Sequence, residues 1–512
     1  MLTPFQNILK KPFGLCPGVF SFLLLSFYFI IPTLSGQGTF SFSPLAKKAY
    51  QSTFELKLTK AKEELRELQI AEPENLIGVL IEDYIDFFTI FINENEEEFH
   101  RLEKNKAGRL RKIKTGDPQS PYYNYCQAEI YLHWALARIK FEEYFTAFNE
   151  VRNAFRLLNN NQDEYPDFVA NKKSLGMLHA LIGTVPENYQ WGLKLIGGME
   201  GTIQQGQKEI EEVLAYSKTR DFIFKDETIF MYSLLQLHLK NNQKEAWETM
   251  EGSGVDPETS PLATFAFANV ALRTGQTDKT IEILESRPNG TEYSPFPYLD
   301  YMLGLAWLYK LDPKAEMFLQ SYLDHFQGIN YIKEANQKIA WSKWIRGDKD
   351  GYRKYMDRCK QEGGAVIGGD KMAQREAENG VPPHPTLLKA RLLFDGAYYT
   401  RAAEVLEDQK ANFQQGDHSL EFAYRLGRVY QKLGDNEQAL KNYETAIREG
   451  ENDPAYYACN SALQLGIMYE EQGATGMAIQ WFEKCLSLKP KEYRSSLHQK
   501  AKAGLNRIYS KS

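Results

Sequence analysis

The order of small and aromatic residues between residues 421 and 490 occurs twice, and this recurrence constrains the fold more than any other feature. The first copy contains Leu426, Gly427, Tyr430, Gly434, Ala439, Tyr443 and Ala446. The second copy contains Leu465, Gly466, Tyr469, Gly473, Ala478, Phe482, Cys485 and Pro490. Such a period is typical of a repeated helix–turn–helix unit, which buries its apolar surface by stacking on the next unit.

The residues of the two copies resemble the tetratricopeptide repeat (TPR), a unit of about 34 residues in which small side chains allow two antiparallel helices to touch. Degenerate matches extend the resemblance to about half of the chain. The resemblance implies an all-α fold, a TPR-type helix-turn-helix solenoid. It also implies a protein that binds other proteins or peptides.

The first 36 residues differ from the rest of the chain in composition. Lys10 and Lys11 precede an apolar run at residues 19–31, which is followed by Pro32 and small residues. This order is typical of a secretory signal peptide, and the apolar run is shorter than the roughly 20 residues that span a bilayer. We expect cleavage near Gly36 and export to a periplasmic or secreted location. An uncleaved N-terminus that anchors the protein in a membrane or cell envelope is the alternative.

Turn residues and apolar periodicity divide the remaining chain into three parts. Residues 45–220 are expected to form an N-terminal helical region with divergent repeats, residues 226–490 a TPR-like array and residues 491–512 a capping helix. The glycine-rich stretch at 192–206 indicates either a shaped loop or close helix packing. Residues 363–385 are predicted to be a long linker, with a possible short helix at 370–378.

Charge and motif spacing argue against several classes of function. The net charge is −6 and the pI about 5.9, so no basic stripe is expected and nucleic acid is not a predicted partner. Histidine and cysteine spacings typical of a metal site are absent. In the glycine-rich stretch at 364–371, Asp370 precedes Lys371 and no Ser or Thr follows, unlike a phosphate-binding loop. The sequence therefore predicts no metal, no cofactor and no catalysis.

The TPR resemblance implies a ligand on the concave surface, which the first helix of each unit lines. In the first copy the corresponding positions hold Tyr424, Arg425, Arg428 and Lys432. Arginine and lysine at these positions would bind carboxylates or a peptide C-terminus. Salt bridges to acidic neighbours on a wet surface are the alternative role for the same residues.

Two cysteines fall within the second copy of the repeat. Cys459 lies near the start of its first helix and Cys485 near the end of its second helix, and antiparallel packing brings these two ends together. A disulfide between them is possible in an oxidising compartment. The alternative is that both are small buried apolar residues.

Three other functions remain open at the level of sequence. Aromatic residues at 122–125 and 293–301 would serve a protein that binds a small molecule or glycan, if their rings are exposed. A helical hydrolase would require a cleft with titratable residues of shifted pKa. A membrane-tethered assembly factor would retain its N-terminus. We expect an exported, non-catalytic scaffold with a protein or peptide partner.

Overall fold

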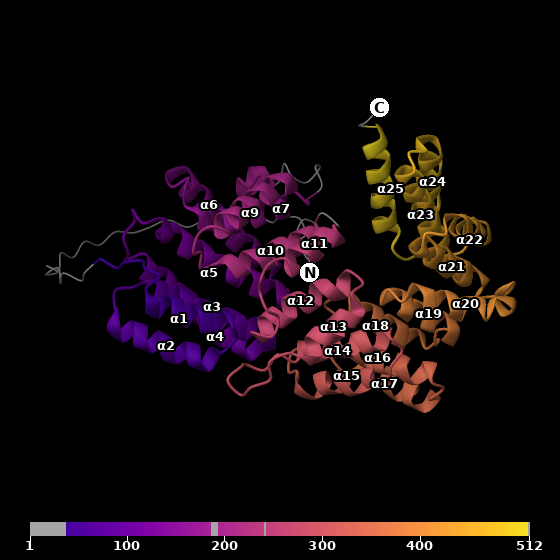
Figure 1. Cartoon of the computed structure of the whole chain (residues 1–512), viewed down its shortest axis with the longest axis horizontal. Coiled ribbons are helices and arrows are strands. Elements are labelled where there is room, and N and C mark those ends of the chain that lie inside the picture. Colours follow the sequence, from indigo (N-terminus) through magenta and orange to yellow (C-terminus); the bar gives the residue numbers. More distant parts are fainter. Residues whose placement is uncertain (1–36, 186–192, 240–241, 510–512) are drawn as a thin grey trace, which may run out of the picture. The chain divides into compact units, whose positions relative to one another are not determined.

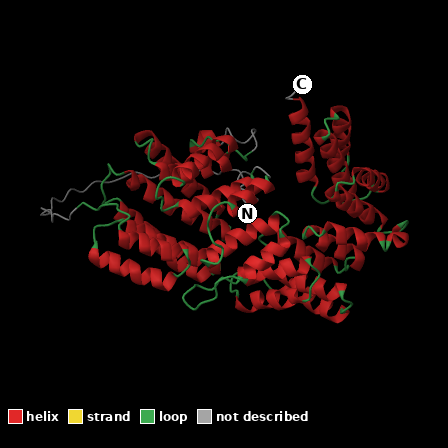
Figure 2. Cartoon of the chain, in the orientation of Figure 1, coloured by secondary structure: helices red, strands yellow, loops and turns green. Residues whose placement is uncertain are grey.

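The computed structural model describes residues 37–185, 193–239 and 242–509, and these residues fold almost entirely into α-helices (Figure 2). Within these ranges, β-type pairing is limited to two isolated bridges, between Gly38 and Gly116 and between Thr39 and Asn75. The all-α prediction is confirmed. The predicted signal peptide lies outside the described residues.

The chain divides into two compact units. Of the described residues, those before 275, together with 282–299 and 325–330, form unit 1, and residues 275–281, 300–324 and 331–509 form unit 2. The helices of unit 1 are α1 (Pro44–Phe54), α2 (Leu58–Ala71), α3 (Ile77–Asn93), α4 (Glu96–Ile113), α5 (Pro121–Lys140), α6 (Tyr144–Glu164), α7 (Val169–Ile182), a π-helical turn (Leu193–Gly197), α9 (Ile203–Ser217), α10 (Lys225–His238), α11 (Gln243–Glu251) and α12 (Pro261–Arg273) (Figure 1).

The boundaries of the units fall within α13 (Thr277–Glu285), α14 (Tyr298–Tyr309) and, at its last residue, α15 (Lys314–His325). The remaining helices of unit 2 are α16 (Ile332–Ile345), α17 (Lys349–Gln361), α18 (Gly368–Asn379), α19 (Pro385–Asp395), α20 (Tyr399–Glu407), a 3-10 turn (Lys410–Phe413), α21 (Ser419–Leu433), α22 (Asn436–Glu449), α23 (Tyr457–Glu471), α24 (Thr475–Ser487) and α25 (Arg494–Tyr509).

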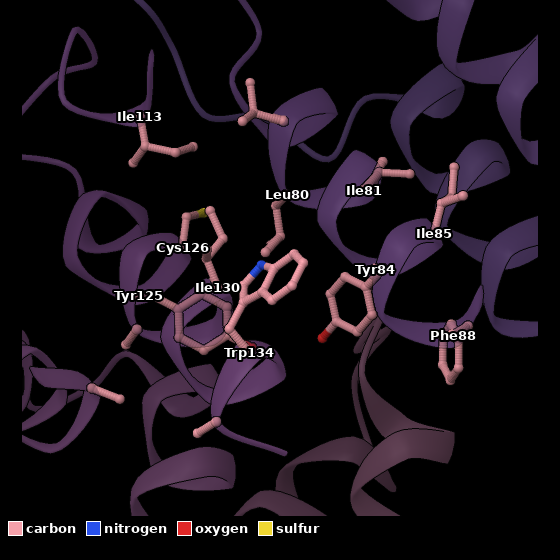
Figure 3. Packing of buried hydrophobic residues seen from close by; sticks show 14 of the residues in the cluster. Leu80, Ile81, Tyr84, Ile85, Phe88, Ile113, Tyr125, Cys126, Ile130 and Trp134 are labelled. Carbon is pink, nitrogen blue, oxygen red and sulfur yellow. The ribbon is translucent and has the colours of Figure 1, made fainter. Parts of the chain in front are cut away.

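The core of unit 1 forms where α3 and α5 pack together. Figure 3 shows Trp134 and Ile130 of α5 beside Leu80 and Tyr84 of α3. The Trp134 and Tyr84 side chains are only 2% exposed. Burying a large aromatic side chain contributes roughly 1.5–3 kcal/mol, so this contact holds the two helices together.

The two sequence copies in unit 2 form the helical pairs α21–α22 and α23–α24. A Cβ atom built on Gly427 would lie 2.6 Å from the ring of Tyr443, and one on Gly466 would lie 2.5 Å from the ring of Phe482. In each pair, the glycine of the first helix therefore accommodates the aromatic ring of the second. This is the packing that the repeated pattern predicts.

The segment at 363–385 is more ordered than a linker. It contains the 12-residue helix α18, which packs against α16. Asp370, fully buried in α18, accepts hydrogen bonds from the backbone N–H groups of Tyr331 at 2.7 Å and Glu334 at 2.9 Å. The possible short helix predicted at 370–378 is confirmed within α18, and the buried carboxyl of Asp370 caps the start of α16.

Part of the glycine-rich stretch forms a close helix contact. A Cβ atom on Gly206 of α9 would lie 2.1 Å from the carbonyl oxygen of Gly176 on α7, and one on Gly201 would lie 2.6 Å from His179 Cα. Only glycine allows the backbones to approach this closely. Gly201 and Gly206 therefore serve close helix packing, one of the two interpretations of this stretch, rather than a shaped loop.

Candidate functional site

The four residues predicted to bind a ligand all lie on α21, and they differ in exposure. Tyr424 is buried, Arg425 and Arg428 are half-buried and Lys432 is exposed. Tyr424, Arg428 and Lys432 follow one another at intervals of four residues, so they lie along one side of the helix. Arg428 Nη1 donates a hydrogen bond to the Tyr424 hydroxyl at 3.0 Å.

Arg425 has a carboxylate partner within its own helix. Its Nε donates to Glu421 Oε1 at 2.7 Å, and the two side chains are only 13% and 20% exposed. Burial alone would raise the pKa of Glu421, but the charge and hydrogen bonds of Arg425 outweigh burial and hold that pKa below its usual range. Arg425 therefore forms a salt bridge to an acidic neighbour, which was the alternative role considered for it.

Arg428 has no carboxylate partner among the described residues. Its guanidinium carbon lies 4.8 Å from the centre of the Phe394 ring, which is the last aromatic residue of α19. Its Nε is buried and has no hydrogen-bond partner. The Arg428 side chain as a whole is half-buried, so the part of its guanidinium that reaches solvent can bind an incoming carboxylate.

Three further tyrosines surround Tyr424. The Tyr424 ring centre lies 5.7 Å from that of Tyr456 and 5.1 Å from that of Tyr457, and Tyr456 lies 5.0 Å from Tyr493. Asn460 Nδ2 donates to the Tyr424 hydroxyl at 2.7 Å. Burial raises the pKa values of Tyr456 and Tyr457, so both remain neutral hydrogen-bonding groups at physiological pH.

Arg391 on α19 adds a cation from another helix to this region. It lies close enough to Arg425 and Tyr456 for their charges to affect one another, and its Nε is 3.7 Å from Asp395. We call the surface formed by Arg391, Tyr424, Arg428, Tyr456 and Asn460 the arginine–tyrosine face. Its members come from α19, from α21 and from the start of α23. Reasoning from single repeats missed Arg391 and Tyr456 because neither falls at the ligand-facing positions of the clear copies.

A basic hollow of about 750 Å³ lies at the start of α25. Its lining includes Lys491, Arg494 and Lys502, for which the described residues provide no salt bridge, and also Tyr493. Tyr493 contacts Tyr456 and donates a hydrogen bond to Met372 Sδ of α18 at 2.9 Å. The hollow therefore adjoins the arginine–tyrosine face through Tyr493, which places three more cations near that face.

The two cysteines of the second copy lie next to each other. The sulfur atoms of Cys459 and Cys485 are 3.6 Å apart, and both residues are buried free thiols. Antiparallel packing of α23 and α24 brings them together, as the repeat predicts. The disulfide stays a prediction.

Unit 1 contains a buried ionic cluster that sequence analysis missed. Lys173 Nζ lies 2.9 Å from Glu129 Oε2 and 2.6 Å from Glu227 Oε1, and the Lys173 side chain is only 1% exposed. Tyr50 and Tyr84 donate hydrogen bonds to Glu227, each at 3.1 Å. Glu129, Lys173 and Glu227 come from three helices, α5, α7 and α10, so no local spacing could indicate the cluster.

The cluster satisfies its own charges. Burial alone would raise the pKa of Glu129, but the charges of Lys173 and His133 hold it below the usual range. The rings of Tyr125 and Phe224 lie 5.8 Å and 4.9 Å from Lys173 Nζ. Enclosure by rings and partners is typical of a structural ion pair rather than of a hydrolase cleft.

The aromatic residues considered for a small molecule or glycan pack against other side chains. Tyr125 is fully buried, Tyr301 is 2% exposed and Tyr122 is half-buried. Tyr122 lies edge-on to Phe168, with ring centres 4.8 Å apart. None of these three rings offers an open platform for stacking.

Carboxylates in the described ranges come together with one histidine in a way that suits metal binding. Ligand atoms of His100, Glu103 and Glu143 lie within 4.8 Å of one another. Both carboxylates, however, already bind the Arg138 guanidinium. A cation in their midst makes this surface group a poor metal site. In the described part of the chain, no helix combines the length and the apolar character needed to cross a bilayer.

Comparison with known proteins identifies the repeats in unit 2. Residues 419–491, which contain α21 to α24, match the tetratricopeptide repeat family. The sequence matches no curated protein. Tyr424, Arg428, Tyr456 and Asn460 of the arginine–tyrosine face lie in this segment that is similar to the tetratricopeptide repeat, whereas Arg391 lies before it.

Several solved structures are similar to this chain at low identity. The Cut9–Hcn1 hetero-tetramer of the APC/C is 12% identical, covers 88% of this chain and 95% of its own, and gives a TM-score of 0.28. The human IFIT1 dimer with m7Gppp-AAAA is 13% identical, with coverage of 92% and 90% and a TM-score of 0.28. The P58(IPK) TPR domain is 14% identical, with coverage of 80% and 97% and a TM-score of 0.20.

Proposed function

We propose that this protein is an exported, non-catalytic TPR scaffold that binds a protein or peptide segment on its arginine–tyrosine face. The observation that carries the proposal is the state of Arg428. Its guanidinium is held over Phe394 while its buried Nε has no hydrogen-bond partner. Arg428 is half-buried and has no carboxylate partner among the described residues, so a carboxylate of a bound segment can pair with the part of the guanidinium that reaches solvent.

The groups around Arg428 suit a peptide. Arg391 and Arg428 provide donors for carboxylates, and the half-buried rings of Tyr456 and Tyr457 provide apolar surface for side chains. Asn460 and Gln464, which are joined by a hydrogen bond of 3.2 Å, provide amides that match a peptide backbone. A segment with acidic and apolar side chains satisfies all three kinds of group.

Export is part of the proposal and is supported by the order of charged, apolar and small residues at 10–36. A membrane-tethered assembly factor differs from this scaffold only in retaining those residues. The mass of the mature N-terminus distinguishes the two, since cleavage near Gly36 removes the apolar run.

The test compares Arg428→Gln with the matched variant Lys441→Glu, which changes an exposed cation on α22 of the same repeat. Both proteins and the wild type are crosslinked in the native compartment, and captured proteins are quantified by mass spectrometry. We expect a partner that the wild type and Lys441→Glu capture equally and that Arg428→Gln captures at least ten-fold less. Equal capture by Arg428→Gln contradicts the proposed site.

A second variant separates loss of binding from loss of structure. Arg391→Glu changes the half-buried cation of α19 and leaves the Arg428–Tyr424 hydrogen bond in place. We expect it to reduce capture of the same partner while circular dichroism shows an unchanged helix content. If the wild type captures no protein, the proposal is wrong and a small ligand becomes the better explanation.

A further inference from the structure

A second groove lies in unit 1, between α2, α3 and α4. Its volume is about 570 Å³, and six of its lining residues are cations: Lys62, Arg66, Lys104, Arg109, Arg111 and Lys112. Only two carboxylates, Glu82 and Asp86, line it. This excess of positive charge contrasts with the net charge of −6 for the whole chain. We call it the basic groove.

The carboxylates of the basic groove already have partners. Asp86 accepts hydrogen bonds from Arg109 at 2.6 Å and from Asn105 at 3.0 Å, and Glu82 accepts one from Gln69 at 2.7 Å. These contacts join the three helices and fix the floor. The groove is therefore preformed and needs no ligand to order it.

The other five cations have no salt bridge in the described part of the chain. Arg66 and Lys62 stand exposed on α2, and Lys104 and Arg111 stand exposed on α4, as does Lys112. By contrast, Lys48 and Lys60, on α1 and α2 outside the groove, both lie within 4.0 Å of Glu64. Unpaired cations on two opposite walls attract a ligand with negative charges along its length.

We propose that the basic groove binds an acidic peptide segment of a partner protein, independently of the arginine–tyrosine face. Three kinds of group support a peptide. The cations bind carboxylates, the amides of Gln69 and Asn105 match a peptide backbone, and Leu65, Val79 and Ile85 line the floor with apolar side chains.

Nucleic acid fits the same groove poorly. No aromatic side chain lines it, so bases have no ring on which to stack. The floor carboxylates of Glu82 and Asp86 repel phosphates, whereas a peptide can place apolar or amide groups over them. These two features favour a peptide over a polyanion of uniform charge.

The test uses a fluorescein-labelled peptide of twelve residues, alternating Glu and Ser, with a photo-crosslinking group at one end. The full-length protein is irradiated with the peptide, and crosslinked sites are mapped by mass spectrometry. We expect crosslinks in α2 and α4, and we expect them to fall at least ten-fold when salt is raised from 50 mM to 500 mM.

The variant Arg66→Glu/Lys104→Glu reverses one cation on each wall. Its matched control is Lys208→Glu/Lys218→Glu, which reverses two exposed cations of unit 1 on and just after α9. We expect the first variant to lose the α2 and α4 crosslinks at least ten-fold and the control to keep them within two-fold. Unchanged helix content by circular dichroism shows that both variants fold.

Three outcomes overturn the proposal. The first is that the two variants give equal crosslinks in α2 and α4. The second is that the peptide crosslinks only to other helices. The third is that a single-stranded oligonucleotide of twelve residues competes as well as unlabelled peptide. Because the readout is the crosslinked helix, peptide bound at the arginine–tyrosine face gives sites in α19 to α23 and does not affect the result. Failure here is thus distinguishable from failure of the proposed function.

Discussion

The ionic cluster of unit 1 and the repeats of residues 419–491 solve the same packing problem with different chemistry. Around Lys173, charged side chains from separate helices are buried and form ion pairs with one another. In the repeats, glycines on one helix accept aromatic rings from the next, as Gly427 accepts Tyr443. The first arrangement depends on every partner being present, whereas the second depends on shape.

This difference has an energetic consequence. Taking charges out of water is expensive, and removing one partner leaves the others buried without compensation. Adding a methyl group to a tight glycine contact costs less, because the neighbouring ring and helices can shift to make room for it. We therefore expect the ionic cluster to be the more sensitive of the two regions.

Lys173→Met is expected to have the largest effect on stability. It leaves the carboxylates of Glu129 and Glu227 without their cation, and we expect it to destabilise unit 1 by about 3–5 kcal/mol. Hydrogen exchange of α5 and α7, followed by mass spectrometry, measures the loss. Lys172→Met is the matched control, because the neighbouring Lys172 pairs with Glu212 at a side-chain exposure of 25%. A loss below 1 kcal/mol for Lys173→Met would mean that the cluster is not held by charge.

Gly427→Ala tests the shape-based packing of the repeats. The new Cβ meets the Tyr443 ring at 2.6 Å, so we expect a loss of about 1–3 kcal/mol in the stability of α21 and α22. Gly476→Ala is the control, since Gly476 on α24 has no atom within 4 Å of its added Cβ. That substitution should stabilise the helix by about 0.5–1 kcal/mol. If both alanines have the same effect, the glycine–ring contact does not limit the packing.

Two buried carboxyl groups, one in each unit, differ in the direction of their pKa shifts. Glu129 has a cation beside it, and its pKa is lowered despite burial. Asp370 is fully buried with two backbone N–H donors but no paired cation, and burial raises its pKa to about 7. Glu129 forms a direct ion pair with Lys173, whereas the charge of Lys333 near Asp370 is too weak to offset burial.

This contrast predicts a pH dependence for unit 2. The pKa of Asp370 rises from 3.8 in the unfolded chain to about 7 in the folded one, so its stabilising contribution is present below pH 4 and is lost as the pH rises through 7. The free energy of unfolding, relative to Asp370→Asn, should fall by at most about 1.4 kcal/mol per pH unit between pH 4 and 7. Chemical unfolding of both proteins at pH 5, 6, 7 and 8 measures the difference. A difference that is flat or rises over this range contradicts the assignment.

Much of unit 2 could be predicted from sequence because its contacts are local. Leu426, Gly427 and Tyr443 lie within one helical pair, and their spacing repeats, so the periodicity predicts both helices and the glycine–ring contact. Helix α18 was harder to predict because its flanking glycines and prolines are typical of a loop. The hydrogen bonds that Asp370 accepts at the start of α16 join residues 36 to 39 positions apart, so no local pattern indicates them.

The candidate site was predictable in part. Tyr424, Arg428 and Lys432 share one side of α21, as the repeat spacing predicts, and Lys432 is exposed. The pairing of Arg425 with Glu421 could be inferred only as an alternative, because an interval of four residues permits a salt bridge but does not require one. Arg391 lies on another helix, α19, and no local sequence pattern predicts that it belongs to the site.

The all-α class, the position of the clear repeats and the proximity of Cys459 and Cys485 could be predicted from sequence, because they depend on periodicity within one helical pair. Which cations lack a carboxylate partner depends on how the side chains pack in the folded structure. Arg428 lacks a carboxylate and Arg425 has one, and the basic groove gathers its cations from α2 and α4. Charge composition is a property of the chain, whereas pairing depends on distances of a few ångströms between side chains that packing alone fixes.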